Sequence, residues 1–183
     1  MSEYLKRMAR YNQWMNQKLY EKTLLLSPED IALERGAFFD SILGTFNHIY
    51  VADLLWLRRF AGTKVCKEIL APITEMDKPK SLRDILYTDV KILAKKRQTL
   101  DELILLFSQT WTQANLAEPI RYRNMAGQKQ SQPLGTLLQH LFNHQTHHRG
   151  QITTMLHQAG IDPSVTDLLV MAMEESGNPQ VQN

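Results

Sequence analysis

Apolar residues recur every three or four positions over four long stretches of the chain, the spacing of a helix that buries one face. The first stretch covers residues 4–26 and ends before Pro28, because the residue that precedes a proline is driven out of the helical region. The second stretch, residues 37–60, is apolar on almost every side, so we expect it to be buried against more than one neighbour. We predict helices over both stretches, with a short link over residues 28–36.

Two more long helices are predicted in the second half of the chain. Residues 82–108 carry a third apolar stripe, and Ser81 with Asp84 three residues later resembles a capping box that opens a helix. The fourth stripe covers residues 134–159. Gly160 follows it and suits a left-handed helix cap, so the fourth helix is expected to end there.

The segments between the predicted helices differ in character. Residues 61–80 include one glycine, two prolines, four lysines and two glutamates, and we interpret them as a long, irregular crossover. Residues 109–132 have polar flanks around Gly127, which predicts a small hairpin that turns there. Pro133 then suits the first turn of the fourth helix. A short closing helix is expected over residues 164–175.

Together these elements indicate an all-α fold, a four-helix bundle with a small hairpin before the fourth helix and a short C-terminal helix. The long second connection lets the second and third helices run parallel, which favours the order up-down-down-up over up-down-up-down. We predict one domain over residues 1–176 and a flexible tail over residues 177–183.

Composition excludes several functional classes. The 183 residues include 21 Lys and Arg against 19 Asp and Glu, and the charges are interspersed, so no basic stripe that would bind nucleic acid is present. The single cysteine, Cys66, excludes an internal disulfide framework and a cysteine-rich zinc site, and we interpret it as an incidental thiol. No run approaches the ~18 apolar residues of a membrane span, and the N-terminus lacks an apolar signal segment. We expect a cytoplasmic protein with neither a nucleic-acid nor a membrane partner.

Two histidines stand in the fourth apolar stripe, where apolar residues are expected. His144 and His148 are four residues apart, so about 40° separates them around the helix and one lies a turn above the other. Imidazole rarely enters such a stripe unless a partner uses its N–H or its lone pair. A catalytic zinc, nickel or iron site needs at least three protein ligands, and His48 is the histidine outside the fourth helix that can complete the set. The alternative is that all three are hydrogen-bonded core residues.

Four further polar residues leave two interpretations open. His140 either faces solvent or a hydrogen-bond partner, or it is a spare ligand. Asp89 either pairs with a basic side chain at the rim of the bundle or contacts a metal-bound histidine. Arg149 suits a salt bridge better than an anionic substrate, and Gln151 can hold either a water molecule or a ligand histidine.

Other exceptions to the helical pattern suggest structural roles. Asn12 interrupts the first apolar stripe, and we predict a structural hydrogen bond between helices for its amide. Gly150 lies in the middle of a helix, where we expect it to allow a close approach of another helix. His147 is expected to face another neighbour or solvent, and His157 suits the negative end of the helix dipole.

Three motifs resemble the DinB family of four-helix-bundle proteins. The strongest is the fourth-helix motif His144-x-x-x-His148-Arg149-Gly150-Gln151. The second-helix residues Asn47-His48 and Leu55-Trp56-Leu57 are similar to another family motif, and residues 11–16 are similar to the first-helix signature, with methionine at a position where alanine is common. The resemblance covers residues 4 to about 175.

The resemblance implies a divalent metal bound by His48, His144 and His148, and a homodimer. Some relatives are transferases or isomerases that depend on a low-molecular-weight thiol. We therefore expect a zinc- or nickel-dependent enzyme, a thiol transferase or a hydrolase, that acts on a small-molecule substrate by lowering the pKa of a water molecule or of a thiol. No residue is assigned as catalytic.

The alternative function is a metal-binding or stress-response protein without turnover. That function would require a closed set of protein ligands, with a fourth from His140 or Asp89.

Overall fold

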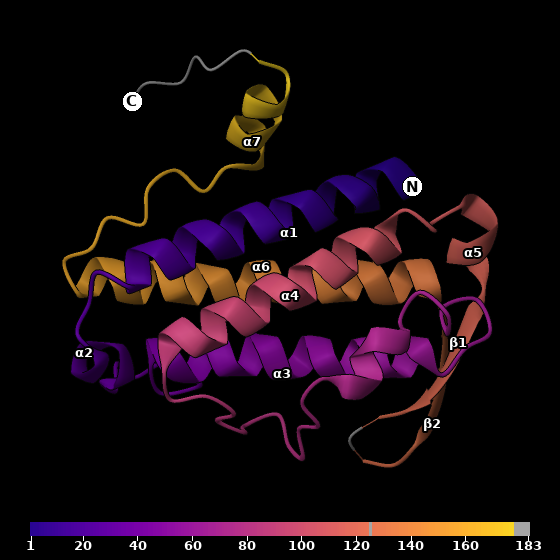
Figure 1. Cartoon of the computed structure of the whole chain (residues 1–183), viewed down its shortest axis with the longest axis horizontal. Helices are drawn as coiled ribbons and strands as arrows, with labels where there is room; N and C mark the ends of the chain where they lie inside the picture. The colour runs from indigo at the N-terminus through magenta and orange to yellow at the C-terminus, as the bar shows by residue number, and fades with distance from the viewer. Residues whose placement is uncertain (125, 178–183) are drawn as a thin grey trace.

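Four long helices form the protein in the computed structural model, which describes residues 1–124 and 126–177 (Figure 1). They are α1 (Ser2–Thr23), α3 (Ile42–Ala61), α4 (Val90–Ser108) and α6 (Leu134–Gln158). α1 and α6 run in one direction and α3 and α4 in the other, so the predicted up-down-down-up order is confirmed. Apart from Gly177, the predicted tail lies outside the described residues.

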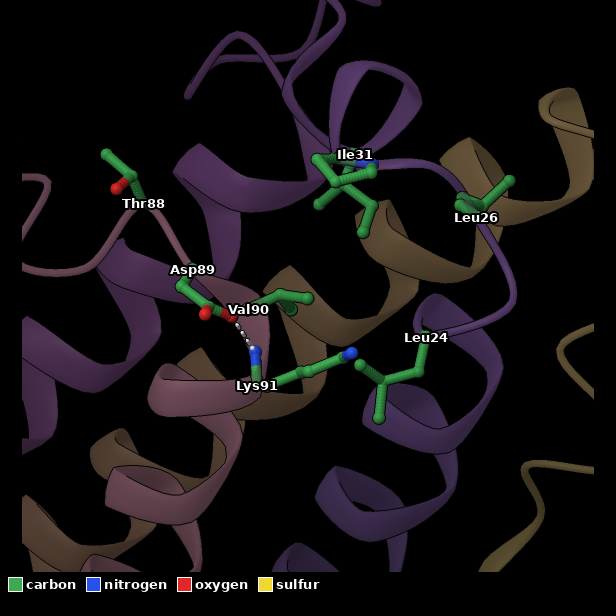
Figure 2. Close-up of a pocket in the computed structure, with 8 residues that line it drawn as sticks. Leu24, Leu26, Ile31, Thr88, Asp89, Val90 and Lys91 are labelled. Carbon is green, nitrogen blue, oxygen red and sulfur yellow. Dashed lines mark hydrogen bonds between the residues drawn. The ribbon is translucent and has the colours of Figure 1, made fainter.

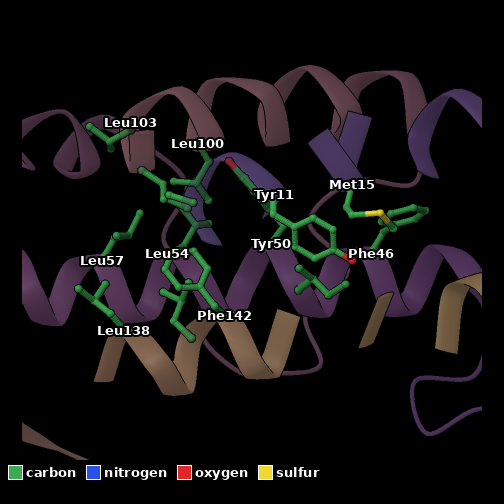
Figure 3. Packing of buried hydrophobic residues seen from close by; sticks show 14 of the residues in the cluster. Tyr11, Met15, Phe46, Tyr50, Leu54, Leu57, Leu100, Leu103, Leu138 and Phe142 are labelled. Carbon is green, nitrogen blue, oxygen red and sulfur yellow. The ribbon is translucent and has the colours of Figure 1, made fainter. Parts of the chain in front are cut away.

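The core lies between the four helices, where their apolar stripes meet. α1 packs against α4 and α6, and α3 packs against α6. Figure 3 shows the centre of this core, with side chains from all four helices: Tyr11, Met15, Phe46, Tyr50, Leu54, Leu57, Leu100, Leu103, Leu138 and Phe142. Burial of each large apolar side chain contributes about 1.5–3 kcal/mol. Among the described helices, none has both the length and the apolar character that a membrane span requires.

The start of the second long helix differs from the prediction. A short helix, α2 (Pro28–Ala32), occupies the predicted link, with its first turn capped by Ser27. α3 begins at Ile42 and not at residue 37, because Asp40 adopts a left-handed conformation with φ of +66°. A Cβ on Gly44 would lie only 2.0 Å from the carbonyl oxygen of Phe39, so the glycine lets this turn fold back onto the helix.

The third long helix also begins later than predicted. Ser81 and Asp84 do interact, with the Ser81 hydroxyl donating to Asp84 Oδ1 at 2.8 Å, but they close an isolated turn that does not continue into a helix. α4 begins only after Asp89, whose carboxylate caps it by accepting the Lys91 N–H at 2.7 Å (Figure 2). The crossover therefore covers residues 62–89, with one short 3₁₀ helix, η1 (Ala71–Glu75).

A single side chain on α3 explains why the end of the crossover is not helical. Asn47 Oδ1 accepts the N–H groups of Leu86 and Tyr87 at 2.9 and 3.1 Å, and its Nδ2 donates to the Tyr87 carbonyl at 2.9 Å. These bonds satisfy backbone groups that a helix would otherwise pair. The apolar residues of this segment therefore pack onto α3 without forming a helical turn.

The predicted hairpin is confirmed, with an additional short helix before it. After α5 (Gln113–Ala117), β1 (Pro119–Arg123) pairs antiparallel with β2 (Lys129–Pro133). Gly127 has φ of +77° in the connecting turn. The hairpin ends directly at α6, for which Pro133 is the N-cap residue.

The end of the fourth long helix follows the prediction more closely than the segment after it. Gly160 has φ of +78°, and its N–H donates to the His157 carbonyl, so the left-handed cap is confirmed. The closing helix α7 (Leu168–Glu175) is four residues shorter at its start than predicted. The segment before it crosses α1, where the Tyr11 hydroxyl donates to the Thr166 carbonyl.

Candidate metal centre

Three histidines from two helices meet at one point. α3 supplies His48, and α6 supplies His144 and His148 one turn apart. One ring nitrogen from each residue lies within 4.8 Å of the other two, an arrangement that can hold a metal ion. The Nε2 atoms of His48 and His144 are 3.0 Å apart, and the ring centroids of His144 and His148 are 4.4 Å apart. The structure thus brings together the three residues that the sequence singled out.

Two of the three rings are fixed by hydrogen bonds on their outer side. His48 Nδ1 lies 2.9 Å from the carbonyl oxygen of Leu82, and His148 Nδ1 lies 2.8 Å from Oε1 of Gln151. Both oxygens can only accept, so each ring carries its proton on Nδ1 and presents the lone pair of Nε2 to the other rings. Ligand histidines in metal sites are oriented in this way. Gln151 thereby has one of its two predicted roles, that of holding a histidine of the set.

The surroundings favour neutral imidazoles. Burial lowers the pKa of His48 to about 4 and that of His144 to about 3, and burial also lowers the pKa of His148. The Phe39 ring stacks on His48 with centroids 3.6 Å apart and an interplanar angle of 15°. Neutral imidazole is the form that binds a metal. His48 Nε2 presents a lone pair to His144 Nε2 at 3.0 Å, so either a proton on the His144 nitrogen or a cation must lie between the two atoms. The residues present fit a divalent ion with metal–nitrogen distances of about 2.0–2.1 Å.

One side of the histidine cluster opens into a pocket of about 340 Å³. His48 and His144 form part of its wall, so a molecule in the pocket would lie beside the cluster. The rest of the wall comes from the second half of α3, the crossover, the hairpin and the first half of α6: Ala52, Leu55, Trp56, Arg59, Leu82, Tyr122, Asn124 and His140. The hairpin thus contributes Tyr122 and Asn124 to the wall of the pocket.

The other candidate ligands do not join the cluster. Among the described residues, the set contains three members and no fourth His, Cys, Asp or Glu. His140 is exposed, with its ring centroid 6.0 Å from that of His144, in agreement with its predicted exposure. Asp89 is an exposed helix cap, so neither of its two predicted roles is correct. Cys66 is buried, and burial raises the pKa of its thiol, in keeping with an incidental cysteine.

Three residues of α6 outside the cluster complete the test of the sequence predictions. His147 and His157 are exposed, and Gln151 Nε2 lies 3.3 Å from Nε2 of His147. The prediction of a close helix approach at Gly150 is wrong. No atom beyond the immediate chain lies within 4 Å of the position that a Cβ would occupy there.

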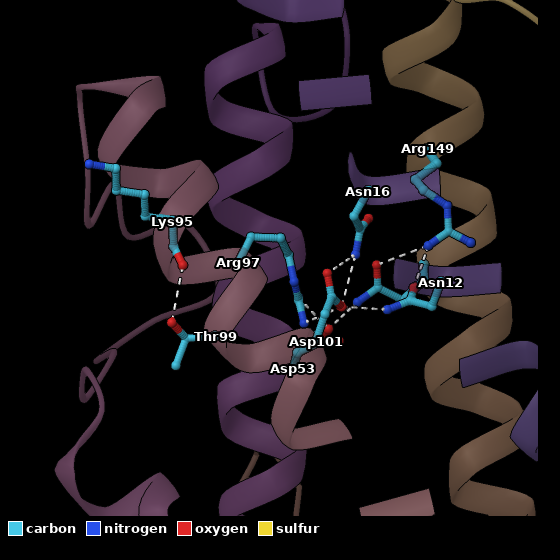
Figure 4. A network of polar contacts seen from close by, with 9 residues as sticks. Asn12, Asn16, Asp53, Lys95, Arg97, Thr99, Asp101 and Arg149 are labelled. Atoms are coloured by element: carbon cyan, nitrogen blue, oxygen red, sulfur yellow. Dashed lines mark hydrogen bonds and ion pairs between the residues drawn. The ribbon is translucent and has the colours of Figure 1, made fainter. Parts of the chain in front are cut away.

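A second buried polar group, which we call the ion cluster, lies between α1, α3, α4 and α6 (Figure 4). It consists of seven side chains, each at most 3% exposed: Asn12, Asn16, Asp53, Arg97, Asp101, Gln145 and Arg149. Arg97 joins the two carboxylates, with Nη1 2.6 Å from Asp53 and Nη2 2.9 Å from Asp101. Burial raises the pKa of both aspartates, and the charge of Arg97 opposes that effect.

The amides of the ion cluster connect its charges. Asn12 Nδ2 donates to Asp101 at 3.0 Å, so the predicted hydrogen bond between helices is confirmed. Arg149 donates to Oδ1 of Asn12 and not to a carboxylate, which corrects the predicted salt bridge. Burial lowers the pKa of Arg149 to about 10. Gln145 Nε2 donates to Oδ2 of Asp53 and thereby links α6 to α3.

The sequence predictions missed most of the ion cluster, although the helical spacing of its two α4 residues can be read from the sequence. Arg97 and Asp101 are four residues apart. Arg97 lies four residues after Leu93 and three before Leu100, and Asp101 lies three residues before Ile104, all of which are buried. Helical spacing alone would have placed them inside. Charged residues are rarely buried, so neither was singled out from the sequence.

Comparisons with known proteins agree with this fold. The sequence model of the DinB family matches residues 1–180. "Protein DinB" of Bacillus subtilis (strain 168) is 31% identical over 167 residues, which cover 91% of this chain and 92% of that protein. An uncharacterized protein of the same strain, YrdA, is 39% identical over 64 residues, or 35% of each chain. Among solved structures, a DinB-like protein from Bacillus cereus ATCC 10987 superposes with a TM-score of 0.55 at 25% identity, and the match covers 85% of this chain and 91% of that one.

Proposed function

The chain belongs to the DinB family, and on this premise we propose that His48, His144 and His148 bind one divalent transition-metal ion. The observation that carries the proposal is the orientation of the rings. Two of them are held through Nδ1 by Leu82 and Gln151, which turns their Nε2 lone pairs toward the third ring. A set of histidines that served only the core would need hydrogen-bond donors at these nitrogens.

Zinc and nickel are the metals that we propose for the site. Three imidazoles without a thiolate or carboxylate suit zinc and nickel among the first-row metals, whereas magnesium and calcium prefer oxygen ligands.

We further propose that the protein is a metal-dependent enzyme, a thiol transferase or a hydrolase, that acts on a small molecule. Three protein ligands leave at least one coordination position for a substrate or a water molecule. The ion would supply Lewis acidity, which lowers the pKa of a water molecule or of a substrate thiol. The pocket beside His48 and His144 gives a substrate access to that position.

The alternative is a metal-binding or stress-response protein without turnover. It requires a closed set of ligands, and among the described residues His140 is the nearest further histidine to the pocket side of the cluster. If His140 completes the site, replacing it with alanine should lower metal affinity as strongly as replacing His148. If the site is open, His140→Ala should leave the metal content unchanged.

Metal analysis tests the proposed site. Protein purified without chelators or a nickel column should contain about one zinc or nickel ion per chain, and His148→Ala should contain none. His157→Ala is the matched control, since it removes an exposed histidine from the same helix and should keep the metal. A His148→Ala variant with full metal content would contradict the proposal.

An activity screen then separates the enzyme from the alternative. Transfer of small thiols to a chloronitroaromatic electrophile, and hydrolysis of a chromogenic ester, can be followed by absorbance. We expect one of these activities in the metal-loaded protein and none in His148→Ala. Metal at full occupancy with neither activity would favour the protein without turnover. The homodimer stays a prediction, which the mass measured by light scattering tests.

A further inference from the structure

Asn47, the residue before the proposed ligand His48, directs its side chain to backbone groups of the crossover and of its own helix. The amide is fully buried. Its Oδ1 accepts the N–H groups of Leu86 and Tyr87, and its Nδ2 donates to the carbonyls of Tyr87 and Leu43 at 2.9 and 3.0 Å. An amide side chain has two donor hydrogens and two acceptor lone pairs, so all four are occupied. Three of the four bonds attach the end of the crossover to α3.

Apolar packing holds the second half of the crossover only in part, so these bonds matter to its position. No residue from 74 to 89, a stretch that the structure describes throughout, is buried, whereas Leu70 and Ile73 in the first half are. Arg83 also bonds across this region, with its Nη2 donating to the Phe38 carbonyl at 3.2 Å, but its side chain is exposed. Hydrogen bonds in a buried place are stronger than those in contact with water.

The bonds of Asn47 act close to the atom that orients His48. The Leu82 carbonyl accepts the Nδ1 proton of His48 and lies in the turn of residues 81–84, which is closed by its own hydrogen bonds. Leu86 follows that turn by two residues, so few backbone torsions separate it from the carbonyl. The place where Asn47 holds Leu86 therefore limits where the Leu82 carbonyl can lie relative to the imidazole.

We propose that Asn47 is a positioning residue of the histidine cluster, which keeps the Leu82 carbonyl on Nδ1 of His48 by holding the end of the crossover on α3. His48 thereby keeps its proton on Nδ1 and its Nε2 lone pair toward His144 and His148. The acceptors that orient ligand histidines affect metal affinity. The inference rests on the proposed function in its effect on the metal, whereas its effect on the imidazole proton requires no metal.

The Nδ1 proton of His48 provides a direct test in the metal-free full chain. Nuclear magnetic resonance measures its exchange with water, together with that of the Nδ1 proton of His148. The second proton is the internal reference, because it is accepted by Gln151 of the same helix and not by the crossover. In Asn47→Leu, which has nearly the same shape but no hydrogen bonds, we expect the His48 proton to exchange about tenfold faster, as the loss of one hydrogen bond implies. The His148 proton should be unchanged.

Further variants control the interpretation. Thr45→Val removes a buried hydroxyl of the same helix that donates to the Ser41 carbonyl and not to the crossover, so it should leave both protons unchanged. Asn47→Ala tests the same bonds if Asn47→Leu does not fold, because it leaves room for water at the freed N–H groups. Asn47→Asp keeps an acceptor for those two N–H groups, so its His48 proton should exchange more slowly than that of Asn47→Leu.

Zinc affinity measures the consequence for the metal centre. Competition with a zinc-binding dye should give an affinity about tenfold lower in Asn47→Leu and unchanged in Thr45→Val. Loss of a contact that orients a ligand histidine lowers metal affinity about 10–100-fold, and the smaller value is expected because Asn47 acts through the crossover.

Three results would overturn the assignment. The first is a folded Asn47→Leu or Asn47→Ala variant in which the His48 proton exchanges as slowly as in the unaltered protein. The second is equally faster exchange of the His148 proton, which would mean that Asn47 stabilises the bundle as a whole. The third is faster exchange at His48 with unchanged zinc affinity. If the chain bound no metal, the proton measurement would still test the position of the ring, so failure of this proposal is distinguishable from failure of the metal site.

Discussion

The histidine cluster and the ion cluster are both polar groups buried in the same bundle, yet they satisfy their hydrogen-bonding needs in opposite ways. Both take residues from α3 and α6. On α6 the two sets are interleaved, with His144 and His148 in one and Gln145 and Arg149 in the other. Neighbouring residues on a helix point about 100° apart, so one helix supplies two separate sites.

The ion cluster balances its charges among the described residues, although Oδ1 of Asp53 and Nε of Arg97 have no hydrogen-bond partner there. Its two aspartates and two arginines have formal charges that sum to zero, and the amides of Asn12 and Asn16 donate to Asp101. The histidine cluster has three inward nitrogens and, once Nδ1 is protonated on two rings, an excess of acceptors over donors. Buried acceptors that face one another with too few donors indicate a ligand, whereas buried charges that pair with one another indicate structure.

The largest effect that this difference predicts is on the ion cluster. Asp101→Ala should lower the free energy of unfolding by about 3–5 kcal/mol, because it leaves Arg97 buried with one counterion and removes the acceptor of two amides. Urea denaturation measures it. His148→Ala, compared in the metal-free state, should lose less, since removal of a neutral ring leaves no buried charge without its counterion.

Glu102→Ala provides the control for that measurement. Glu102 follows Asp101 on the same helix but is exposed, so its loss should change stability by no more than about 0.5 kcal/mol. If metal-free His148→Ala were as unstable as Asp101→Ala, the histidines would belong to the structural core and the contrast between the two clusters would fail.

A smaller effect is expected where a side chain acts on the metal through a histidine. Gln151→Leu removes the acceptor that orients His148 but none of the three proposed ligands. Loss of such a contact lowers metal affinity about 10–100-fold. Competition with a zinc-binding dye measures it, and Gln158→Leu, a change at an exposed position of the same helix, serves as the control. An unchanged affinity would show that Gln151 does not act through His148.

The smallest effect concerns Gly150, which lies beside both clusters in sequence and contacts neither. Because a Cβ at this exposed position meets no atom within 4 Å, Gly150→Ala should raise the free energy of unfolding by about 0.5–1 kcal/mol through helix propensity alone. Thermal and urea unfolding measure it. A loss of stability would mean that another chain approaches this face, as in the homodimer that the family resemblance implies.

The parts of the fold that were predicted correctly depend on local spacing. The stripe of α6, its cap at Gly160 and the turn at Gly127 all follow from residues that are close in sequence. The start of α4 was predicted wrongly because Asn47, about forty residues earlier, bonds to the backbone of Leu86 and Tyr87. A bond between such distant residues leaves no periodic trace in the segment that it shapes.

In the candidate site too, some residues could be predicted from local spacing and others could not. His144 and His148 were identified because imidazole is unexpected in an apolar stripe, and His48 joined them as the histidine outside the fourth helix. The hydrogen-bond acceptors that orient the rings could not be predicted equally well, since a backbone carbonyl such as that of Leu82 has no sequence signature. The ion cluster was missed because Arg97 and Asp101 are charged residues at inward positions, and charge is ordinarily a sign of the surface.

The hydrogen-bond acceptor that orients His48 is the main-chain carbonyl oxygen of residue 82, an atom that every amino acid carries. Substitution of Leu82 can change the packing of the crossover, but it cannot delete the main-chain oxygen that receives the imidazole proton. Insertions or deletions in residues 62–81 would shift that oxygen along α3 even if every side chain of the centre were kept. For relatives of this protein, the length of this one segment should therefore predict the geometry of the centre better than the identity of any residue within it.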